Sequence, residues 1–551
     1  MQALGVSGGS CFYMDLLGQL REITRHDKQA ILSIFMGQER LLWEAFPRYN
    51  KDGDPIGWEG EPAGAAMMRA CAERGIWSEM DRLRGLGAWA DQDGELVLHC
   101  GDGVLHKGEW RPPGDIEGHV YPALPKIPRP LAPDADTEGV ADELHRLLDS
   151  WEWDRQDDAW LLMGWIGCAL FGGALKWRPL MWVTGGPGSG KSTLQDVIFH
   201  VLGGEGAVLH SSDATAASLW QTLTTSSRAV VLDEIEPDVD NRQRMLGVIK
   251  LARQAASGGN VMRGSADHKS TEFKARSCFL FSSVLVPTML DQDISRMALM
   301  ELHDLPRDAP PPKIVPSQLK RCGQALRRRI LDGWPRWHET LELYRQALAH
   351  VGHGARGSDQ FGTLLAMADL MLEDELPTPE RCGLFASKLS AQAVNDQMDQ
   401  AQDWQRLAAH WLTQHVEVWR GGHRMPLSML MQAAADLPSD PEDGGDRPAK
   451  GEARKRLREH GLIVEGEKDR ARLLVANRHH QLSRLSQDTH WHAGAGQTGV
   501  WRQSLLRVPG ANVPKKSFSF DGHKQKCVAV PLLTFLEGLS GPPDAPHPDS
   551  T

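Results

Sequence analysis

A glycine-rich segment ends in a lysine and two hydroxyl residues, and its spacing is that of a phosphate-binding loop. Residues 181–193 read MWVTGGPGSGKST and contain the pattern G-x-x-x-x-G-K-[ST]. In this pattern glycines let backbone N–H groups wrap phosphates, the lysine reaches the outer phosphates and the next hydroxyl ligates Mg²⁺. The segment therefore predicts a site for ATP and Mg²⁺, with Ser192 as a metal ligand. Its predicted residues are Gly185, Gly186, Pro187, Gly188, Ser189, Gly190, Lys191, Ser192 and Thr193.

The flanking residues supply the elements that such a loop needs. An apolar strand is expected at Leu180–Val183 and a helix at Ser192–Leu202, whose positive end would point at the phosphates. The glycines also loosely match a dinucleotide-binding fingerprint. The Lys-Ser pair, and the lack of a fitting acidic residue on a second strand, argue against that alternative.

A second apolar strand ends in two acids about 40 residues after the loop. Residues 229–234 read AVVLDE, and strands of a parallel sheet present ligand-binding residues at their carboxyl ends. We expect Asp233 to hold Mg²⁺ and Glu234 to orient and activate the attacking water. The alternative is a strand that happens to end in a solvated acidic turn.

Two later segments add candidate catalytic residues. An apolar strand at 278–281 leads into Ser282 and Ser283, which could contact the γ-phosphate. Arg296 precedes a fourth apolar strand, Met297–Leu302, and could stabilise transition-state charge across a subunit boundary. A surface salt bridge is the alternative role for this arginine.

Residues 249–276 predict a helix followed by a hairpin between the second and third strands. The hairpin would project from one face and carry Arg263, His268 and Lys269. In a ring these three residues could grip the phosphate backbone of single-stranded DNA. A solvated hairpin without a ligand is the alternative.

Composition limits the class of protein. The chain has 551 residues, 41% hydrophobic and 24% charged, and a net charge of −11, which argues against a surface coated in nucleic acid. No apolar run approaches the roughly 18 residues of a membrane span, so we expect a cytoplasmic protein without a membrane partner. Its eight cysteines form no C-x-x-C pair, which argues against a disulfide framework or a zinc ribbon.

Proline-rich and polar segments divide the chain. They predict an N-terminal α+β domain (1–133) with two short strands around the turn at 101–103, and an α/β ATPase domain with a preceding helical segment (134–308). A helical region (309–437), with helices running to about Val418, comes next. A winged-helix-like domain (438–540) and a disordered tail (541–551) complete the prediction.

Two basic clusters lie in the C-terminal part. Arg454, Lys455, Arg456 and Arg458 are almost consecutive on a predicted helix, which could be a recognition helix or a solvated face. A histidine group lacks cysteine or carboxylate partners at ligand spacing, which argues against a metal site. Its members are His479, His480, His490 and His492.

The sequence resembles the superfamily 3 helicases, which have an AAA+ core, and more closely the helicase part of phage and prophage primase-helicases. The resemblance rests on GGPGSGKS at 185–192, AVVLDE at 229–234, LHSSDATAASL at 209–219, RQAASGG, RGS and the segment 293–296, with RGLGAW and LVLHCGDGVL further upstream. It implies a P-loop AAA+ ATPase that forms a hexameric ring and hydrolyses ATP to move along single-stranded DNA during phage or mobile-element replication. One departure is that the family has Asn at the sensor position, where this chain has Ser282 or Ser283.

Two functions remain open at this point. One is the DNA helicase or translocase, and the other is an ATP-gated DNA-binding or replication-initiator protein without processive unwinding. No primase motif is visible, so either primase activity lies in another chain or this protein is a helicase only.

Overall fold

The computed structural model describes most of the chain. The described residues are 1–186, 188–223, 225–233, 242–258, 260–264, 270–283, 296–304, 312, 314–419, 423–438, 447–487, 489, 491–492 and 501–537. At 242–243, 260–264, 270–274, 392–393, 395–403, 418–419, 423 and 503 the description is of the backbone alone. The described chain forms two compact units: the first takes in most residues up to Ala391, and the second takes in residues from Gln392 onward.

A five-stranded sheet organises the first unit. In spatial order its strands are β13 (Val208–Ser211), β14 (Ala229–Leu232), β17 (Phe279–Ser283), β12 (Leu180–Gly185) and β18 (Met297–Leu302). The pairs β12–β18, β13–β14 and β14–β17 are parallel. The central strands are buried along their whole length, as continuous apolar runs in a parallel sheet require.

Four of these strands follow from the sequence, and the edge strand β13 does not. Its residues, Val208 to Ser211, are half polar and only Val208 is buried, so the segment lacks the apolar run that marks the others. The fold class is therefore α/β, with five parallel strands rather than the four expected.

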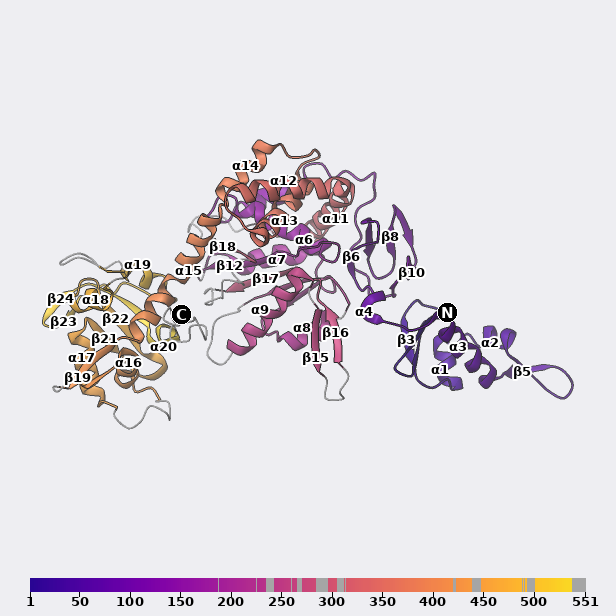
Figure 1. Cartoon of the computed structure of the whole chain (residues 1–551), viewed down its shortest axis with the longest axis horizontal. Helices are drawn as coiled ribbons and strands as arrows, with labels where there is room; N and C mark the ends of the chain where they lie inside the picture. The colour runs from indigo at the N-terminus through magenta and orange to yellow at the C-terminus, as the bar shows by residue number, and fades with distance from the viewer. Residues whose placement is uncertain are drawn as a thin grey trace, which may run out of the picture. The chain divides into compact units, whose positions relative to one another are not determined.

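Helices cover the sheet on both sides. In Figure 1, α11, α12 and α13 lie above β12, β17 and β18, while α8 and α9 lie below. The helices of this unit after the N-terminal region are α5 (Val140–Leu148), α6 (Asp158–Phe171), α7 (Lys191–Leu202), α8 (Ala216–Leu223), α9 (Arg242–Ser257), α11 (Pro316–Gly333), α12 (Trp337–His350), α13 (Ala355–Leu372) and α14 (Pro379–Lys388).

The helix α6 is apolar on every face, which is typical of a helix enclosed by protein. All but one of its residues are buried. At Gly164 a Cβ would overlap the carbonyl of Leu364 on α13, so glycine is what allows these two helices to approach closely. Gln360 of α13 also exchanges hydrogen bonds with the backbone of Leu180, at 2.7 and 3.3 Å, which fixes the first residue of β12.

The hairpin predicted after α9 is present. It consists of β15 (Asn260–Gly264) and β16 (Ser270–Lys274), and it points away from the sheet (Figure 1). Arg263 lies on β15. The turn that contains His268 and Lys269 lies outside the described residues.

The N-terminal region is built from small antiparallel sheets and short helices. Its elements are β1 (Gln2–Ser7), β2 (Ser10–Met14), β3 (Leu20–Ile23), α1 (Lys28–Ile34), α2 (Glu39–Ala45), β4 (Pro47–Tyr49), β5 (Pro55–Trp58), α3 (Gly60–Arg74), α4 (Glu79–Arg82), β6 (Gly87–Ala90), β7 (Leu96–His99), β8 (Val104–His106), β9 (Glu109–Arg111), β10 (Gly114–Ile116) and β11 (His119–Tyr121). The two strands predicted around the turn at 101–103 are β7 and β8, which pair antiparallel.

A glycine seam joins this region to the parallel sheet. Gly85 N–H donates to Thr225 O at 3.0 Å, and Ser227 N–H donates to Leu86 O at 2.9 Å. A Cβ at Gly85 would come within 2.5 Å of Ser226 Oγ, and one at Gly87 would overlap Ser227 Oγ. Only glycine therefore lets the segment that leads into β6 run along the segment that leads into β14.

The second unit has its own apolar core. Its elements are α15 (Ala391–Leu412), β19 (His415–Trp419), β20 (His423–Pro426), α16 (Leu427–Ala435), α17 (Lys450–Glu459), β21 (Leu462–Glu465), β22 (Arg472–Ala476), α18 (His480–Leu485), α19 (Trp501–Leu506), β23 (Phe518–Phe520), β24 (His523–Gln525), β25 (Cys527–Pro531) and α20 (Leu532–Leu536). The core includes Trp411, Leu430, Leu457 and Val528, which come from helices and strands of this unit.

Two predicted boundaries fall in this part of the chain. Helical structure was expected to about Val418, but α15 ends at Leu412 and residues 415–419 form β19, so that boundary was wrong. Alternating side chains in HVEVW fit a strand better than a helix. The predicted domain boundary at 437/438 falls within the second unit, which includes α15 and α16.

None of the helices that the structure describes combines the length and apolarity needed to cross a bilayer. The eight cysteines are free thiols, and seven of them are buried.

Candidate nucleotide-binding site

The glycine-rich loop connects the carboxyl end of β12 to the start of α7. Gly188 and Gly190 have φ of 93° and 83°, a left-handed backbone that glycine adopts without steric cost. At Gly185 a Cβ would come within 2.6 Å of Leu302 O and 2.8 Å of Ser189 Oγ. Three glycines of the motif are thus required by the backbone itself. Pro187 lies outside the described residues.

Lys191 is the first residue of α7, and its side chain folds back over the loop. Nζ donates to Gly185 O at 2.5 Å and to Gly186 O at 3.0 Å. Its positive charge adds to the positive end of a twelve-residue helix, where backbone N–H groups have no helical partner. Ser192 is exposed and Thr193 half-buried, so both follow the lysine near the open end of the helix.

Asp233 directly follows the last residue of β14, at the same edge of the sheet. Its Oδ1 accepts a hydrogen bond from Gln195 Nε2 at 2.8 Å, and its N–H donates to Ser211 O at 3.1 Å. Because Gln195 is one helical turn beyond Lys191, both residues are on one face of α7. The structure therefore holds Asp233 against the helix face that begins with the lysine.

His210 fixes the orientation of the Gln195 amide. On β13, its Nε2 is 3.1 Å from Gln195 Oε1, so the ring can donate to the oxygen and leave the amide N–H₂ facing Asp233. Gln195 is 3% exposed, and an amide buried this far needs such partners. Neither residue was predicted from the sequence, although a glutamine four positions after the lysine in an apolar helix was a usable signal.

Trp151 anchors the loop from outside the motif. Its Nε1 donates to Gly190 O at 3.1 Å, and the ring is 3% exposed. The residues around it run beside the end of β18: His303 N–H donates to Glu152 O at 2.8 Å, and Asp154 N–H to Glu301 O at 2.9 Å. Trp151 therefore holds a carbonyl of the glycine-rich loop from outside the motif.

The candidate sensor residues end the strand between β12 and β14. Leu232 of β14 pairs with Phe281 of β17, so Ser282 and Asp233 occupy equivalent positions on neighbouring strands. Parallel strands are about 4.8 Å apart. Ser282 and Ser283 are both buried, with exposed fractions of 0% and 2%. The Oγ of Ser282 has no hydrogen-bond partner among the described residues. Glu234 lies outside the described residues.

Arg296 does not share this edge. In the register of β12 with β18, Leu180 pairs with Met297 and Gly185 with Leu302. Arg296 therefore precedes the amino end of β18, roughly 20 Å along the strand from the glycine loop at about 3.3 Å per residue. Within one chain, Arg296 and the glycine-rich loop therefore lie at opposite ends of the paired strands β18 and β12.

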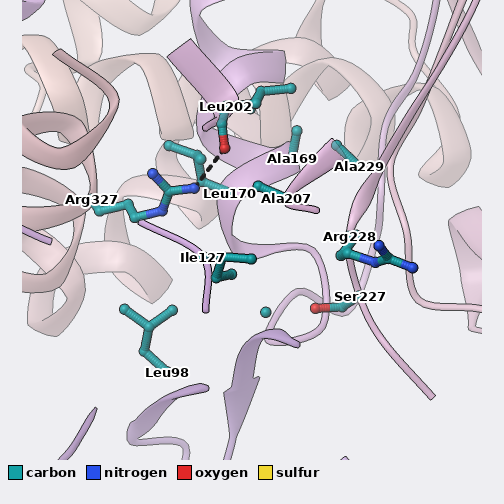
Figure 2. Close-up of a pocket in the computed structure, with 11 residues that line it drawn as sticks. Leu98, Ile127, Ala169, Leu170, Leu202, Ala207, Ser227, Arg228, Ala229 and Arg327 are labelled. Carbon is teal, nitrogen blue, oxygen red and sulfur yellow. Dashed lines mark hydrogen bonds between the residues drawn. The ribbon is translucent and has the colours of Figure 1, made fainter. Parts of the chain in front are cut away.

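Arg327 holds the far end of α7. This arginine of α11 is 3% exposed and donates to Leu202 O, at the carboxyl end of α7, at 2.8 Å. Figure 2 shows this contact at the rim of a small cavity lined by Leu98, Ile127 and Ser227 among others. Burial lowers the pKa of the guanidinium to about 10, which leaves it charged at neutral pH and able to compensate the negative helix end.

Oxygen ligands for Mg²⁺ are available at this edge. Mg²⁺ prefers carboxylate and hydroxyl oxygens, the groups that Asp233 and Ser192 carry, and the bond from Gln195 limits how the carboxylate can turn. A separate group, Asp91, His106 and Glu117, has ligand atoms within 4.8 Å of one another. There Lys107 Nζ lies 2.7 Å from Glu117 and already neutralises it.

Comparisons with known proteins add little. No protein-family model and no curated protein matches the chain. The chain is similar to a solved apo structure of the NrS-1 C-terminal region, with TM-score 0.29, 12% identity, and coverage of 73% of this chain and 78% of that one. Two further structures of that region have TM-scores of 0.30 and 0.31 at 11% and 12% identity, covering 95% of this chain and 96% of theirs. Similarity this weak carries no argument about fold or function.

Proposed function

We propose that this chain is an ATP-dependent DNA helicase or translocase of a phage or mobile-element replication system. Its parallel sheet would be a P-loop AAA+ core of the superfamily 3 type. The observation that carries the proposal is the hydrogen bond from Gln195 to Asp233, one turn beyond Lys191 on α7. It brings a carboxylate to the lysine face of the helix that follows a glycine-rich loop.

The proposed roles follow from chemistry at that edge. Lys191 and the N–H groups of residues 188–193 bind the triphosphate. Ser192 and Asp233 hold Mg²⁺, which neutralises charge on the transferred phosphoryl group. Glu234, next along the chain, orients and activates the attacking water. Ser282, whose buried hydroxyl faces no described partner, contacts the γ-phosphate or the water.

In this proposal, several copies of the chain form a ring that moves along DNA. Because Arg296 and the glycine loop are at opposite ends of β18 and β12, the arginine would serve the site of a neighbouring copy in a hexamer. The hairpin β15–β16 would line the ring opening, where Arg263, His268 and Lys269 contact single-stranded DNA. A primase would be a separate chain.

Calorimetry tests the nucleotide site. Titration of ATP with Mg²⁺ into the full chain should give a saturable heat that is lost in Lys191→Ala. Lys176→Ala, which removes an exposed lysine of the same unit, should bind ATP as the wild type does. Absence of heat with the wild type would remove the ATPase proposal.

An ATP-gated DNA-binding or initiator protein is the second candidate. It is favoured by the second unit, where α17 packs on α16 and β21 and exposes Lys455 and Arg458 on one helix face. A forked duplex separates the two candidates. ATP-dependent strand separation supports the motor, whereas ATP-dependent binding without separation supports the switch.

A further inference from the structure

Two arginines lie over one tryptophan ring where the N-terminal region meets the hairpin. The guanidinium carbon of Arg84 is 5.2 Å from the Trp89 ring centre, and that of Arg276 is 5.7 Å from it. Trp89 is on β6 and is 4% exposed, while both arginines are half-buried. Two like charges therefore share one aromatic surface.

Neither arginine has a carboxylate partner in the described part of the chain. Arg84 donates a hydrogen bond to the carbonyl of its neighbour Leu83 at 3.2 Å. The guanidinium of Arg276 lies over the Trp89 ring. Burial and then the charge of Arg276 lower the pKa of Arg84 to about 10. Asp81 and Tyr121 oppose part of this shift, but no described carboxylate forms an ion pair with either guanidinium. A half-buried, like-charged pair of this kind is unfavourable, and an anion would relieve it.

Other arginines over tryptophan rings in the described chain are neutralised. Arg82 over Trp77 pairs with a carboxylate at 3.0 Å, Arg129 over Trp110 at 3.0 Å, and Arg381 over Trp160 at 2.6 Å. Their partners are Asp115, Asp102 and Glu373. The pair over Trp89 makes the same kind of contact with its ring but has no carboxylate partner among the described residues.

A third donor lies beside the pair. His119 of β11 is half-buried, and its pKa is lowered by burial and then by Arg84 and Arg276, with a smaller effect of Arg82. Asp115 opposes this, but it already pairs with Arg82. Burial first and the neighbouring positive charge second therefore disfavour protonation of the imidazole, and a bound anion would raise its pKa.

The position of the pair connects it to the hairpin. Arg276 comes two residues after β16 ends at Lys274, and β16 contacts α4, which ends two residues before Arg84. Three residues after Arg276 the chain enters β17, the strand that ends at Ser282 and Ser283. An anion held here would therefore lie at the foot of the hairpin.

We propose that Arg84 and Arg276 form a binding site for a backbone phosphate of single-stranded DNA, with Trp89 as the surface that orients both guanidinium groups. Planar guanidinium groups bind phosphate oxygens through paired hydrogen bonds, and a neighbouring ring limits their rotation. This inference rests on the proposed function, because it names a further contact for the same DNA.

Salt-dependent DNA binding by the full chain tests the site. Arg84→Gln/Arg276→Gln should weaken binding of a fluorescent oligothymidine about 10-fold to 100-fold, the loss expected for hydrogen bonds to a charged group. The slope of log affinity against log salt should fall by about 0.7 for each phosphate that the variant no longer neutralises. Arg381→Gln, which removes an arginine paired with Glu373 over another tryptophan, should bind DNA as the wild type does.

A charge-retaining variant and a phosphate-binding assay separate loss of the site from loss of the fold. Arg84→Lys/Arg276→Lys retains both charges, so it should keep most of the salt slope while still binding more weakly, even if the glutamine variant fails to fold. In a Lys191→Ala background, inorganic phosphate should raise the melting temperature, and adding the two glutamine substitutions should remove that shift.

The results separate the two proposals. If the wild type binds DNA and all arginine variants bind equally well, the arginine site is refuted while the helicase proposal stands. If the wild type binds no DNA but phosphate stabilises only chains with both arginines, the anion site stands and its DNA ligand and the helicase proposal are refuted. If the wild type neither binds DNA nor is stabilised by phosphate, both the arginine site and the helicase proposal are refuted.

Discussion

At the scale of single residues, Gln195 determines how Asp233 faces the glycine loop. The Gln195 side-chain oxygen accepts a hydrogen bond from His210, and the side-chain nitrogen donates one to the Asp233 carboxylate. Replacing a residue that orients a metal ligand without touching the metal typically costs about 10-fold to 100-fold in metal affinity or activity. Gln195 is thus a positioning residue in the proposed ATPase.

Gln195→Ala should leave ATP affinity close to that of the wild type and lower ATP turnover about 10-fold to 100-fold. The reason is that Asp233 loses the donor that aligns it, while Lys191 and the loop remain. Steady-state ATPase assays and calorimetry measure the two quantities. Gln346→Ala, on the exposed face of α12, serves as control, and normal turnover in Gln195→Ala would contradict this role.

His479 gives the second unit a predictable pH dependence. Burial, and then the nearby His480, lower its pKa from 6.5 to about 4, with smaller effects of His460 and His523 that Asp521 opposes. Because the folded pKa lies below the unfolded one, the unfolded chain binds the proton first. The stabilisation is present above pH 6.5 and is lost as pH falls towards 4.

His479→Asn should remove part of this pH dependence. Asparagine can still accept the hydrogen bond that His479 Nδ1 receives from Gln481 N–H at the start of α18. Since the ring is only half-buried, we expect a difference on the order of 1 kcal/mol between pH 7 and pH 5. Hydrogen exchange of wild type and variant at each pH measures it, with exposed His415→Asn as control; equal slopes would contradict the assignment.

Local spacing predicts only part of the candidate site. Lys191 and Ser192 follow from the loop motif, and Asp233 from an apolar strand that ends in acids, because each signal lies within a few neighbouring residues. Gln195, His210 and Trp151 escape such reasoning, since their partners are 38, 15 and 39 residues away in the chain. Only the fold brings these donors and acceptors together.

At the scale of elements, α7 owes its position to a close crossing with α11. A Cβ on Gly323 would overlap the carbonyl of Val201, so the two helix backbones are in contact there. Any added atom must push α11 away or shift α7, which begins with Lys191. The loop geometry thus depends on a glycine more than 130 residues from the motif.

Gly323→Ala should destabilise the first unit by roughly 1 to 3 kcal/mol, the usual cost of overpacking, and weaken ATP binding. Gly383→Ala is the matched control. It is also in a helix, α14, but a Cβ there meets nothing within 4 Å, so alanine should stabilise slightly. Thermal unfolding compares the two, and equal melting temperatures would show that the crossing tolerates a methyl group.

Local sequence patterns also predict some strands and miss others. Sequence reasoning identifies β12, β14, β17 and β18 because strands buried in a parallel sheet are uninterrupted apolar runs. It misses β13, where a half-polar sequence lies at the sheet edge, and β19, where a strand of alternating character follows directly on a long helix. Order along the sheet, with β17 inserted between β12 and β14, does not follow from any local pattern.

At the scale of the whole molecule, the opposite positions of Arg296 and Lys191 make a clear prediction. If Arg296 acts on the site of a neighbouring copy, Arg296→Ala should abolish turnover and leave ATP binding near normal. Lys191→Ala should be inactive too. Mixing the two inactive variants should restore part of the ATPase activity, because some interfaces then combine an intact lysine with an intact arginine.

Arg321→Ala is the control for this mixing experiment, since Arg321 is an exposed arginine of α11. Turnover unchanged in Arg296→Ala would remove the residue from the site. Recovery absent on mixing, with both variants folded and assembled, would place its effect within a single copy.

The glycine seam also has a practical consequence for dissecting the chain. Residues 85–88 hydrogen-bond to 225–227, and glycine allows these backbones to touch. A protease that cuts within the proline-rich stretch 121–133 should therefore yield two pieces that co-elute on a sizing column. Expression of the piece after the cut alone would expose the backbone of Thr225 and Ser227 to water, and that piece should aggregate unless residues 1–121 are supplied in the same cell.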